Sequence, residues 1–427
     1  MPMRTIQINH IAKTEGHADF FGALLGGDFA EAKVQTTEGA RLIEGILLGR
    51  KYFEAPIVTA RVCGVCPVVH NLTSIKALEQ ALNIKATPEI VLLRKMMECA
   101  QIIHSHVAHT FFFSLPDLSG DVDNFTLVKK YPKEAEAALA VRHFGVELCR
   151  IIGGRAIHPI NSVVGGFNVE PDFGEVKDLV GQTEEMIRRM NGILDFMWKF
   201  SIPKFERPTN YISLKRKGEY AIYDGKIYFS DNKDYDTAEA FLRDVREITA
   251  PHERVKRVEH LGQPFMVGAL ARLNNNSDEL QPAARTAWRN LGLKLPCYNS
   301  FINIFAQIIE IIHCLAEIKS LFEKYARLRA KRGFEARLKV SFKPNPGKGI
   351  GIMEAPRGLL YHEYELDKEG NILHCNIITP TAMFLANLEA DLAALLPQLK
   401  NASDAKQKAL IKMLIRAYDP CISCATH

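Results

Sequence analysis

Apolar residues recur at helical spacing through most of the chain. The clearest case begins at Thr87-Pro88 and continues with an apolar residue every three or four positions as far as Val107. Thr87 is suited to cap a helix and Pro88 to its first turn, where the missing N–H needs no partner. Similar spacing predicts helices over residues 176–200, 237–248, 301–329, 383–399 and 405–417.

Strand-like patterns are concentrated towards the two ends of the chain. Residues 5–9 alternate between apolar and polar, and further extended pieces continue to about Glu38. Residues 337–342 and 358–379 are rich in β-branched side chains, and the sequence at 368–371 favours a turn. A hairpin is also expected over 219–230, turning at Asp224-Gly225.

These patterns predict the α+β class: a mainly helical protein with a long-helix bundle and small β-sheets from the N-terminal and C-terminal regions. We find no repeat and no linker rich in Gly, Ser or Pro. Residues 1–427 are therefore expected to form one domain, in which the two strand-rich ends meet in space.

The composition is that of a soluble enzyme. Of the 427 residues, 47% are hydrophobic, and 54 basic against 49 acidic residues leave a net charge of +5, too small to favour nucleic acid. The first ten residues lack the apolar core of a secretory signal. The most apolar stretch, 301–315, is interrupted by Gln307, Glu310 and His313, which favours a buried helix over a transmembrane segment. We expect a cytoplasmic protein.

The nine cysteines divide into two groups. Five stand alone in apolar surroundings and are expected to be inert core thiols: Cys99, Cys149, Cys297, Cys314 and Cys375. The other four form two Cys-x-x-Cys pairs, Cys63/Cys66 and Cys421/Cys424. Two thiolates at this spacing can turn towards one metal ion, and a helix starting at Pro67 together with Arg61 would favour the thiolate form.

Sequence alone leaves several interpretations of these pairs open. A structural zinc site is possible, although zinc ribbons usually separate their pairs by about 15–20 residues, whereas 354 residues lie between Cys66 and Cys421. A redox dithiol would need a compact βαβ context that is not predicted around Cys63, and chance is a third possibility. For four thiolates, nickel, iron and zinc all fit by ligand type.

The two motifs together resemble a known family. Arg61-x-Cys-Gly-x-Cys-x-x-x-His70 and Asp419-Pro-Cys-x-x-Cys-x-x-His427 look like the two signature motifs of nickel–iron hydrogenase large subunits. Further similar segments are Glu15-Gly-His17, residues 44–50, 153–167 and 262–270, Glu354-Ala-Pro-Arg-Gly358 and Thr379-Pro-Thr381.

The resemblance implies a metal centre and a reaction. Cys63 and Cys421 would be terminal nickel ligands, and Cys66 and Cys424 would bridge nickel to an iron that carries carbon monoxide and cyanide. The centre would form between residues of about 13–80 and about 354–427. The implied reaction is the reversible heterolytic cleavage of dihydrogen.

The resemblance also assigns roles around the cysteines. Cys421 would accept the proton and Glu15 would carry it away, although without the resemblance Glu15 is better explained as a capping or salt-bridged carboxylate. Arg357, after Pro356, would donate to a cyanide, and Thr381 would be a second donor. Asp419 would orient Arg357 or the second cysteine pair, its alternative being a helix cap. His70 would donate a hydrogen bond to a cysteine sulfur.

A second metal site is implied at the end of the chain. A magnesium ion would be held by Glu44, His427 and a backbone carbonyl near Ile377, and would fix the C-terminal tail. By contrast, His104, His106 and His109 are expected to be interior histidines with hydrogen-bond partners and not ligands.

The electron acceptor must lie on other chains. The sequence has neither an iron–sulfur motif nor a Gly-x-Gly-x-x-Gly element, so the resemblance implies an iron–sulfur small subunit. Further flavin or iron–sulfur subunits would reduce NAD(P), deazaflavin or ferredoxin, and a maturation protease and chaperones would assemble the centre. Lys13 and Ser105 depart from many relatives and favour the cytoplasmic, multi-subunit branch. The rival interpretations are a metal-free hydrogenase-like scaffold subunit of a respiratory complex and a structural four-cysteine zinc protein.

Overall fold

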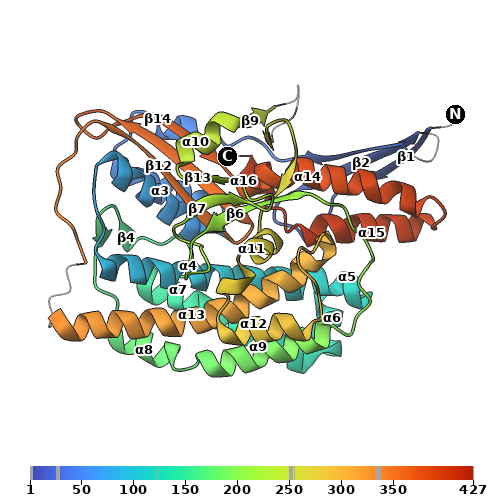
Figure 1. Ribbon diagram of the computed structural model, residues 1–427, viewed down its shortest axis with the longest axis horizontal. Helices are drawn as coiled ribbons and strands as arrows, with labels where there is room; N and C mark the ends of the chain where they lie inside the picture. Colours follow the sequence, from blue (N-terminus) through green and yellow to red (C-terminus); the bar gives the residue numbers. More distant parts are fainter. Residues whose placement is uncertain are drawn as a thin grey trace.

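A bundle of long helices forms one layer of the molecule (Figure 1). The computed structural model describes residues 3–25, 29–121, 123–249, 253, 255–332 and 338–426. In the bundle, α4 (Pro88–Val107) packs against both α7 (Pro132–Gly153) and α13 (Asn303–Arg332), and α9 (Thr183–Met197) packs on α7 and α13. The Thr87 hydroxyl caps α4 by accepting from Ile90 N. Both α4 and α13 match their predicted spans.

Helix α13 is long and apolar enough to cross a membrane by length and composition. Its most apolar window has a mean hydropathy of 1.7, and 89% of that window is buried inside the protein. Its burial against α4 and α9 therefore accounts for its apolar character, as expected for the core helix of a globular protein.

Three local predictions were wrong. The helix predicted over 176–200 is two helices, α8 (Phe173–Val180) and α9, separated at Gly181. The helix predicted over 237–248 ends early: α10 (Ala238–Asp244) passes into strand β9 (Val245–Ile248), which begins with β-branched Val245. In the predicted hairpin only β7 (Lys226–Phe229) is a strand, and it pairs with β6 (Asn210–Lys215). Residues 220–223 are all buried, so they do not alternate between a buried and an exposed face as a half-exposed hairpin strand would.

A three-stranded antiparallel sheet supports the first cysteine pair. It consists of β12 (Gly347–Ala355), β13 (Gly358–Leu366) and β14 (Ile372–Ile378), and α3 (Pro67–Ala81) packs on β12 and β13. Glycines at every second position of β12 permit this contact. A Cβ at Gly347 or Gly349 would lie 2.1 Å from a carbonyl oxygen of α3, so the helix and strand backbones touch directly.

The strands predicted at the N-terminus form a second sheet. It contains β1 (Met3–Ile8), β2 (Ala18–Leu25) and β3 (Phe29–Thr36) in that order, and β3 packs against α14 (Pro380–Leu395). Near the other end, the predicted strands over 358–379 correspond to β13 and β14. Within 337–342, Lys339 makes an isolated bridge to Gly166, and Arg337 lies outside the described residues.

The last short helix lies inside the protein and not at its edge. Helix α16 (Ile422–Ala425) follows α15 (Asp404–Ala417) and contacts α14, near the middle of the molecule in Figure 1. Ile422 N donates to Glu15 O at 2.9 Å, which joins the two ends of the chain.

The remaining elements connect these layers. They are α1 (Ile43–Leu47), α2 (Ala55–Thr59), α5 (Leu115–Ser119), α6 (Asn124–Lys130), β4 (Ser162–Val163), β5 (Gly166–Phe167), β8 (Asp234–Tyr235), β10 (Arg257–His260), β11 (Phe265–Met266), α11 (Ala269–Asn276), α12 (Pro282–Asn290) and the short helices η1 (Tyr52–Glu54), η2 (Ala60–Val62), η3 (Ala108–Ser114), η4 (Ser277–Glu279), η5 (Ser300–Ile302) and η6 (Leu396–Leu399).

Candidate metal centre

Four cysteine sulfurs from opposite ends of the chain meet in one buried cluster. The Sγ atoms of Cys63, Cys66, Cys421 and Cys424 all lie within 4.8 Å of one another. Cys63 Sγ is 3.4 Å from Cys421 Sγ, and Cys66 Sγ is 3.2 Å from Cys424 Sγ. This arrangement suits one soft metal ion or a small cluster, because thiolates are the ligands such metals prefer.

The first pair is held at the start of helix α3. Cys66 is the residue before its first turn, and Pro67 occupies that turn, as the sequence predicted. The Gln101 side chain on α4 fixes the loop from both sides: its amide donates to Val65 O at 2.6 Å and accepts from Val68 N at 2.9 Å. The bundle therefore positions the loop that carries both sulfurs.

The second pair is held by the segment around Glu15 and by helix α14. Cys421 N donates to Thr381 Oγ1 at 3.0 Å, and Ser423 N donates to the Glu15 carboxylate at 3.0 Å. Gly16 has a positive φ of 82°, and a Cβ there would lie 2.7 Å from Ile422 Cβ. Glycine is therefore needed at position 16 for residues 421–426, the C-terminal cysteine arm, to approach residues 15–16 this closely.

Burial and mutual hydrogen bonds shift the pKa values of the cluster thiols in different directions. Hydrogen bonds from Cys421 and its neighbours hold the pKa of Cys63 well below its usual range. Burial raises the pKa of Cys421 and of Cys424 well above the usual value. Without a metal the cluster thus supports one thiolate, because several like charges in a buried site repel one another. Binding through all four sulfurs needs metal charge to compensate.

A buried arginine reaches the cluster from the tip of a hairpin. Pro356 and Arg357 form the two-residue turn between β12 and β13, whose last pair is Ala355 with Gly358. Arg357 lines the same small cavity as Cys66, Cys421 and Cys424. The Asp419 carboxylate beside it, together with the cysteine sulfurs, keeps the pKa of Arg357 well above its usual value despite burial. It is therefore a permanent cation at the centre.

Comparison with known proteins identifies the family. The family model described as nickel-dependent hydrogenase matches residues 41–143 and 254–427, which include all four cysteines. The chain belongs to the nickel-dependent hydrogenase family. It is 32% identical to the alpha subunit of sulfhydrogenase 1 from Pyrococcus furiosus, over 99% of this chain and 97% of that one.

Two further relatives of this hydrogenase are informative. The matching subunit of the F420-non-reducing hydrogenase from Methanothermobacter marburgensis is 27% identical over 100% of this chain and 95% of its own. The crystal structure of an NAD+-reducing [NiFe]-hydrogenase in the H2-reduced state superposes with a TM-score of 0.86 at 26% identity, covering 99% of both chains. The chain is thus the large, catalytic subunit of a nickel–iron hydrogenase, with the predicted α+β fold.

This result decides between the interpretations that the sequence left open. The metal-free scaffold would lack the cysteines, and the hydrogenase has all four in one cluster. A zinc protein does not fit the family, which is nickel-dependent. The two Cys-x-x-Cys pairs are not separate sites either, because all four sulfurs lie within 4.8 Å of one another in a single cluster.

Glu15 is the carboxylate that contacts the cluster. Its Oε2 lies 3.1 Å from Cys421 Sγ, and its backbone carbonyl accepts from Ile422 N. Both the amide and the hydroxyl of Ser423 donate to this carboxylate. Glu15 also accepts from the first two backbone N–H groups of α16, so the capping role is present beside the contact with the Cys421 sulfur.

Arg357 and Asp419 form a fixed pair. Arg357 Nε donates to Asp419 O at 2.7 Å and Nη2 to Asp419 Oδ1 at 2.8 Å, while Nη1 is 3.5 Å from Ser105 Oγ. Asp419 has a left-handed φ of 55°, which turns both its carbonyl and its carboxylate towards the arginine. Gln307 on α13 donates to the second carboxylate oxygen at 3.0 Å. Asp419 therefore orients Arg357 and does not cap a helix.

His70 lines the same cavity as Arg357. Its Nε2 is 3.7 Å from Cys424 Sγ, and its Nδ1 is 3.2 Å from His362 Nε2. His362 Nδ1 is in turn 3.1 Å from the Tyr364 hydroxyl, so a buried polar chain leads from the sulfur into the β12–β14 sheet.

Two of the three residues of the expected magnesium site, Glu44 and Ile377, are described by the structure. Glu44 Oε1 accepts from Ile377 N at 2.8 Å, so the half-buried carboxylate and this strand lie together. His427 lies outside the described residues. The three α4-region histidines are interior, as expected: Gln101, Glu310 and Gln307 are the side-chain partners of His104, His106 and His109 respectively.

Sequence reasoning missed the residues that act through tertiary contacts. Gln101, Ser423 and His362 belong to this set, and so does Arg41, whose side chain contacts both cysteine segments. Ser423 stood between two cysteines already singled out and could have been noted. For the others no local pattern exists, because their partners are distant in sequence.

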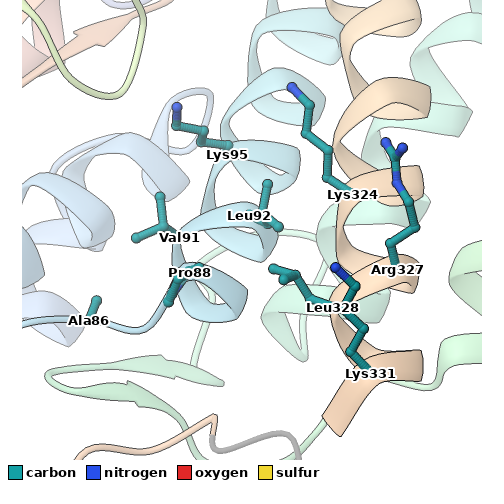
Figure 2. A pocket seen from close by; sticks show the side chains of 9 residues that line it. All are labelled: Ala86, Pro88, Val91, Leu92, Lys95, Lys324, Arg327, Leu328 and Lys331. Carbon is teal, nitrogen blue, oxygen red and sulfur yellow. The ribbon is translucent and has the colours of Figure 1, made fainter.

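A larger hollow lies elsewhere on the protein. A groove of about 640 Å³ lies between the start of α4 and the end of α13. Its lining residues, labelled in Figure 2, include apolar Val91 and Leu328 together with Lys and Arg side chains. None of its nine lining residues is Cys, His, Asp or Glu. The groove therefore offers no donor set that competes with the four sulfurs.

Proposed function

We propose that the four cysteines hold a nickel–iron centre at which dihydrogen is reversibly split into protons and electrons, with the proton leaving through Cys421 and Glu15. The observation that carries this proposal is the convergence of four buried sulfurs with one carboxylate 3.1 Å from Cys421 Sγ. Cys63 and Cys421 would hold nickel, and Cys66 and Cys424 would hold both metals.

The chemistry divides between the metal and the chain. Dihydrogen is a very weak acid, and when bound the nickel–iron centre supplies the electron-pair acceptor that heterolysis requires. The Cys421 sulfur holds the proton, and Glu15 Oε2 takes it from this sulfur within hydrogen-bond reach. Ser423 donates to both oxygens of the Glu15 carboxylate and so keeps it facing the sulfur.

Arg357 supplies fixed positive charge at the cavity. Two hydrogen bonds to Asp419 hold the guanidinium in place, so that its charge needs no rearrangement during the reaction. On the iron side we propose carbon monoxide and cyanide ligands, with Arg357 and Thr381 as donors to cyanide and Pro356 shaping the same wall.

A magnesium ion is proposed at Glu44, the backbone of Ile377 and His427. The support is the contact between the Glu44 carboxylate and Ile377 and the preference of hard cations for oxygen ligands. Its role would be to hold the end of the chain, so that the second cysteine pair stays seated within one domain spanning residues 1–427.

Electrons leave through partner subunits. Each named relative is one subunit of a hydrogenase, and the five cysteines outside the cluster are scattered in the core. We propose an iron–sulfur small subunit docked near Cys63, where the apolar side chains of Phe53, Ile57, Ile157 and Ile160 are exposed. His158 Nδ1, 2.9 Å from Ala60 O, joins these two segments.

The wider assembly follows from the relatives. Further flavin or iron–sulfur subunits would pass electrons to NAD(P), deazaflavin or ferredoxin in the cytoplasm, and a maturation protease and chaperones would install the centre. Support comes from the likeness to an NAD+-reducing enzyme and to an F420-non-reducing one.

The test is metal analysis of the complex purified with its partner subunits. We expect nickel and iron in near-equal amounts, infrared bands of metal-bound diatomic ligands, and exchange between D2 and solvent protons. Zinc alone in the cluster, with no isotope exchange, would refute the proposal.

A further inference from the structure

One side chain joins the two cysteine arms directly. Arg41 Nη2 donates to Val62 O at 2.6 Å and also to Ser423 O. Val62 immediately precedes Cys63, and Ser423 immediately precedes Cys424. A single nitrogen thus lies between two segments that are more than 350 residues apart in sequence.

The backbone of the same residue adds a third contact. Arg41 N donates to Thr426 O at 2.9 Å, beyond the last cysteine. The start of the C-terminal arm is held by Thr381 and Glu15, whereas Arg41 holds its middle and its end. Beside the contacts between the cysteine sulfurs themselves, the Arg41 side chain bonds the backbone of both the arm and the first cysteine loop.

From these contacts we infer that Arg41 is a latch that holds the C-terminal cysteine arm closed on the first cysteine pair and so retains the metal. The arm is one short turn of helix, too short to be stable by itself. Its closed position therefore depends on tertiary hydrogen bonds, and those from a guanidinium to carbonyl oxygens are among the stronger kind. The metal-retaining part rests on the proposed function; the closing of the arm does not.

A different role for Arg41 would be purely electrostatic, as a cation near thiolates. The two roles separate in Arg41→Lys, which keeps the charge but has a shorter side chain, so that its nitrogen ends short of the position of Nη2. A latch needs the reach to both carbonyls, so the lysine variant should resemble Arg41→Ala. A charge effect should leave it close to wild type.

The experiment uses the assembled enzyme with its partner subunits. We would measure hydrogen–deuterium exchange of the peptide containing residues 421–426, and the rate of nickel release into excess chelator. For Arg41→Ala we expect exchange and nickel release to rise on the order of tenfold, the size expected for losing a charge-assisted hydrogen bond. Arg41→Lys should show most of this increase.

The matched control is Arg50→Ala. Arg50 lies on the same surface stretch, but its bonds go to Ile46 O and Glu54, both within the N-terminal segment. Its exchange and nickel release should equal those of wild type. Wild-type exchange in Arg41→Ala, or wild-type behaviour of Arg41→Lys, would overturn the latch. Absence of nickel from the wild-type complex would instead overturn the proposed function, while the exchange rates would still report on the arm.

Discussion

Two groups of cysteines in this protein are equally buried but differ in the groups that surround their sulfurs. The four cysteines of the metal centre and the pair Cys99 and Cys314 are all shielded from solvent. Cys99 on α4 and Cys314 on α13 face each other in the helix bundle, where hydrogen bonding to Cys314 and burial raise the pKa of Cys99 well above its usual value. The bundle pair therefore stays protonated.

The difference lies in the polar groups brought to the sulfurs. Around the metal centre, Glu15, Arg357, His70 and Thr381 come from four separate segments, and each contacts a cysteine or lines its cavity. In the bundle, Cys99 and Cys314 are hydrogen-bonded to each other, and the buried carboxylate of Glu310 pairs with Arg272 and His106. Burial makes a thiol inert, and chemistry requires charges and donors placed beside it.

The largest expected effect comes from exchanging one sulfur in each group. Cys421→Ser should lose nickel and D2 exchange completely, because serine is a poor ligand for a soft metal. Cys314→Ser should retain both, since its partner is another thiol and not a metal. The comparison fails if the Cys314 variant loses nickel while remaining assembled with its partner subunits.

Removing the proton acceptor beside the centre should have the next largest effect. Glu15→Gln keeps the shape and the bonds from Ser423 but cannot take a proton from Cys421. We expect isotope exchange and dye reduction to fall about 10²–10⁴-fold, the range for a positioned acid–base group, with unchanged nickel content. Glu15→Asp should recover part of the activity. Full activity in Glu15→Gln would show that the proton leaves by another route.

Much of the centre could be predicted from the sequence. The two cysteine pairs stand out by their spacing, and Glu15 and Arg357 were singled out through the resemblance to the hydrogenase motifs; the structure brings these residues together. Gln101 and Arg41 could not be found this way. An arginine or glutamine that bonds backbone carbonyls of a distant loop leaves no periodic trace in the sequence.

In the fold, too, elements with a local sequence pattern could be predicted and those that depend on tertiary contacts could not. Helices with clear apolar faces, such as α4 and α13, were predicted almost to the residue. Strand β12 was missed because Gly347, Gly349 and Gly351 remove the β-branched signal. The reason for these glycines is the backbone of α3 beneath them, a tertiary contact that local propensity does not contain.

That contact gives a prediction for the region that supports the centre. Gly349→Ala would place a Cβ 2.1 Å from Ala77 O, so α3 must move, and we expect a loss of about 3 kcal/mol or more in stability together with weaker nickel retention. In the bundle, a Cβ on Gly192 meets nothing within 4 Å, and Gly192→Ala should stabilise α9 by up to about 1 kcal/mol. Thermal unfolding of the two variants measures the contrast. Equal shifts would mean that the glycine contact does not constrain α3.

The smallest effect tests where the two regions meet. His104 on α4 lies beside Gln101, which holds the first cysteine loop, with 2.8 Å between Gln101 Nε2 and His104 Nε2. Burial, aided by Arg142 and Arg357, lowers the pKa of His104 to about 3, whereas an unfolded chain binds the proton near pH 6.5. The folded state thus binds fewer protons below pH 6.5, and stability is lost as the pH falls from 6.5 towards 3. Between pH 6.5 and pH 5 this amounts to about 2 kcal/mol.

His104→Gln removes the titration, so the stability of this variant should fall less steeply over that range, as measured by unfolding at each pH. Parallel pH profiles for the two proteins would mean that His104 is protonated in the folded protein over this pH range. Water would then reach the bundle beside the cysteine loop more readily than the bundle around Cys99.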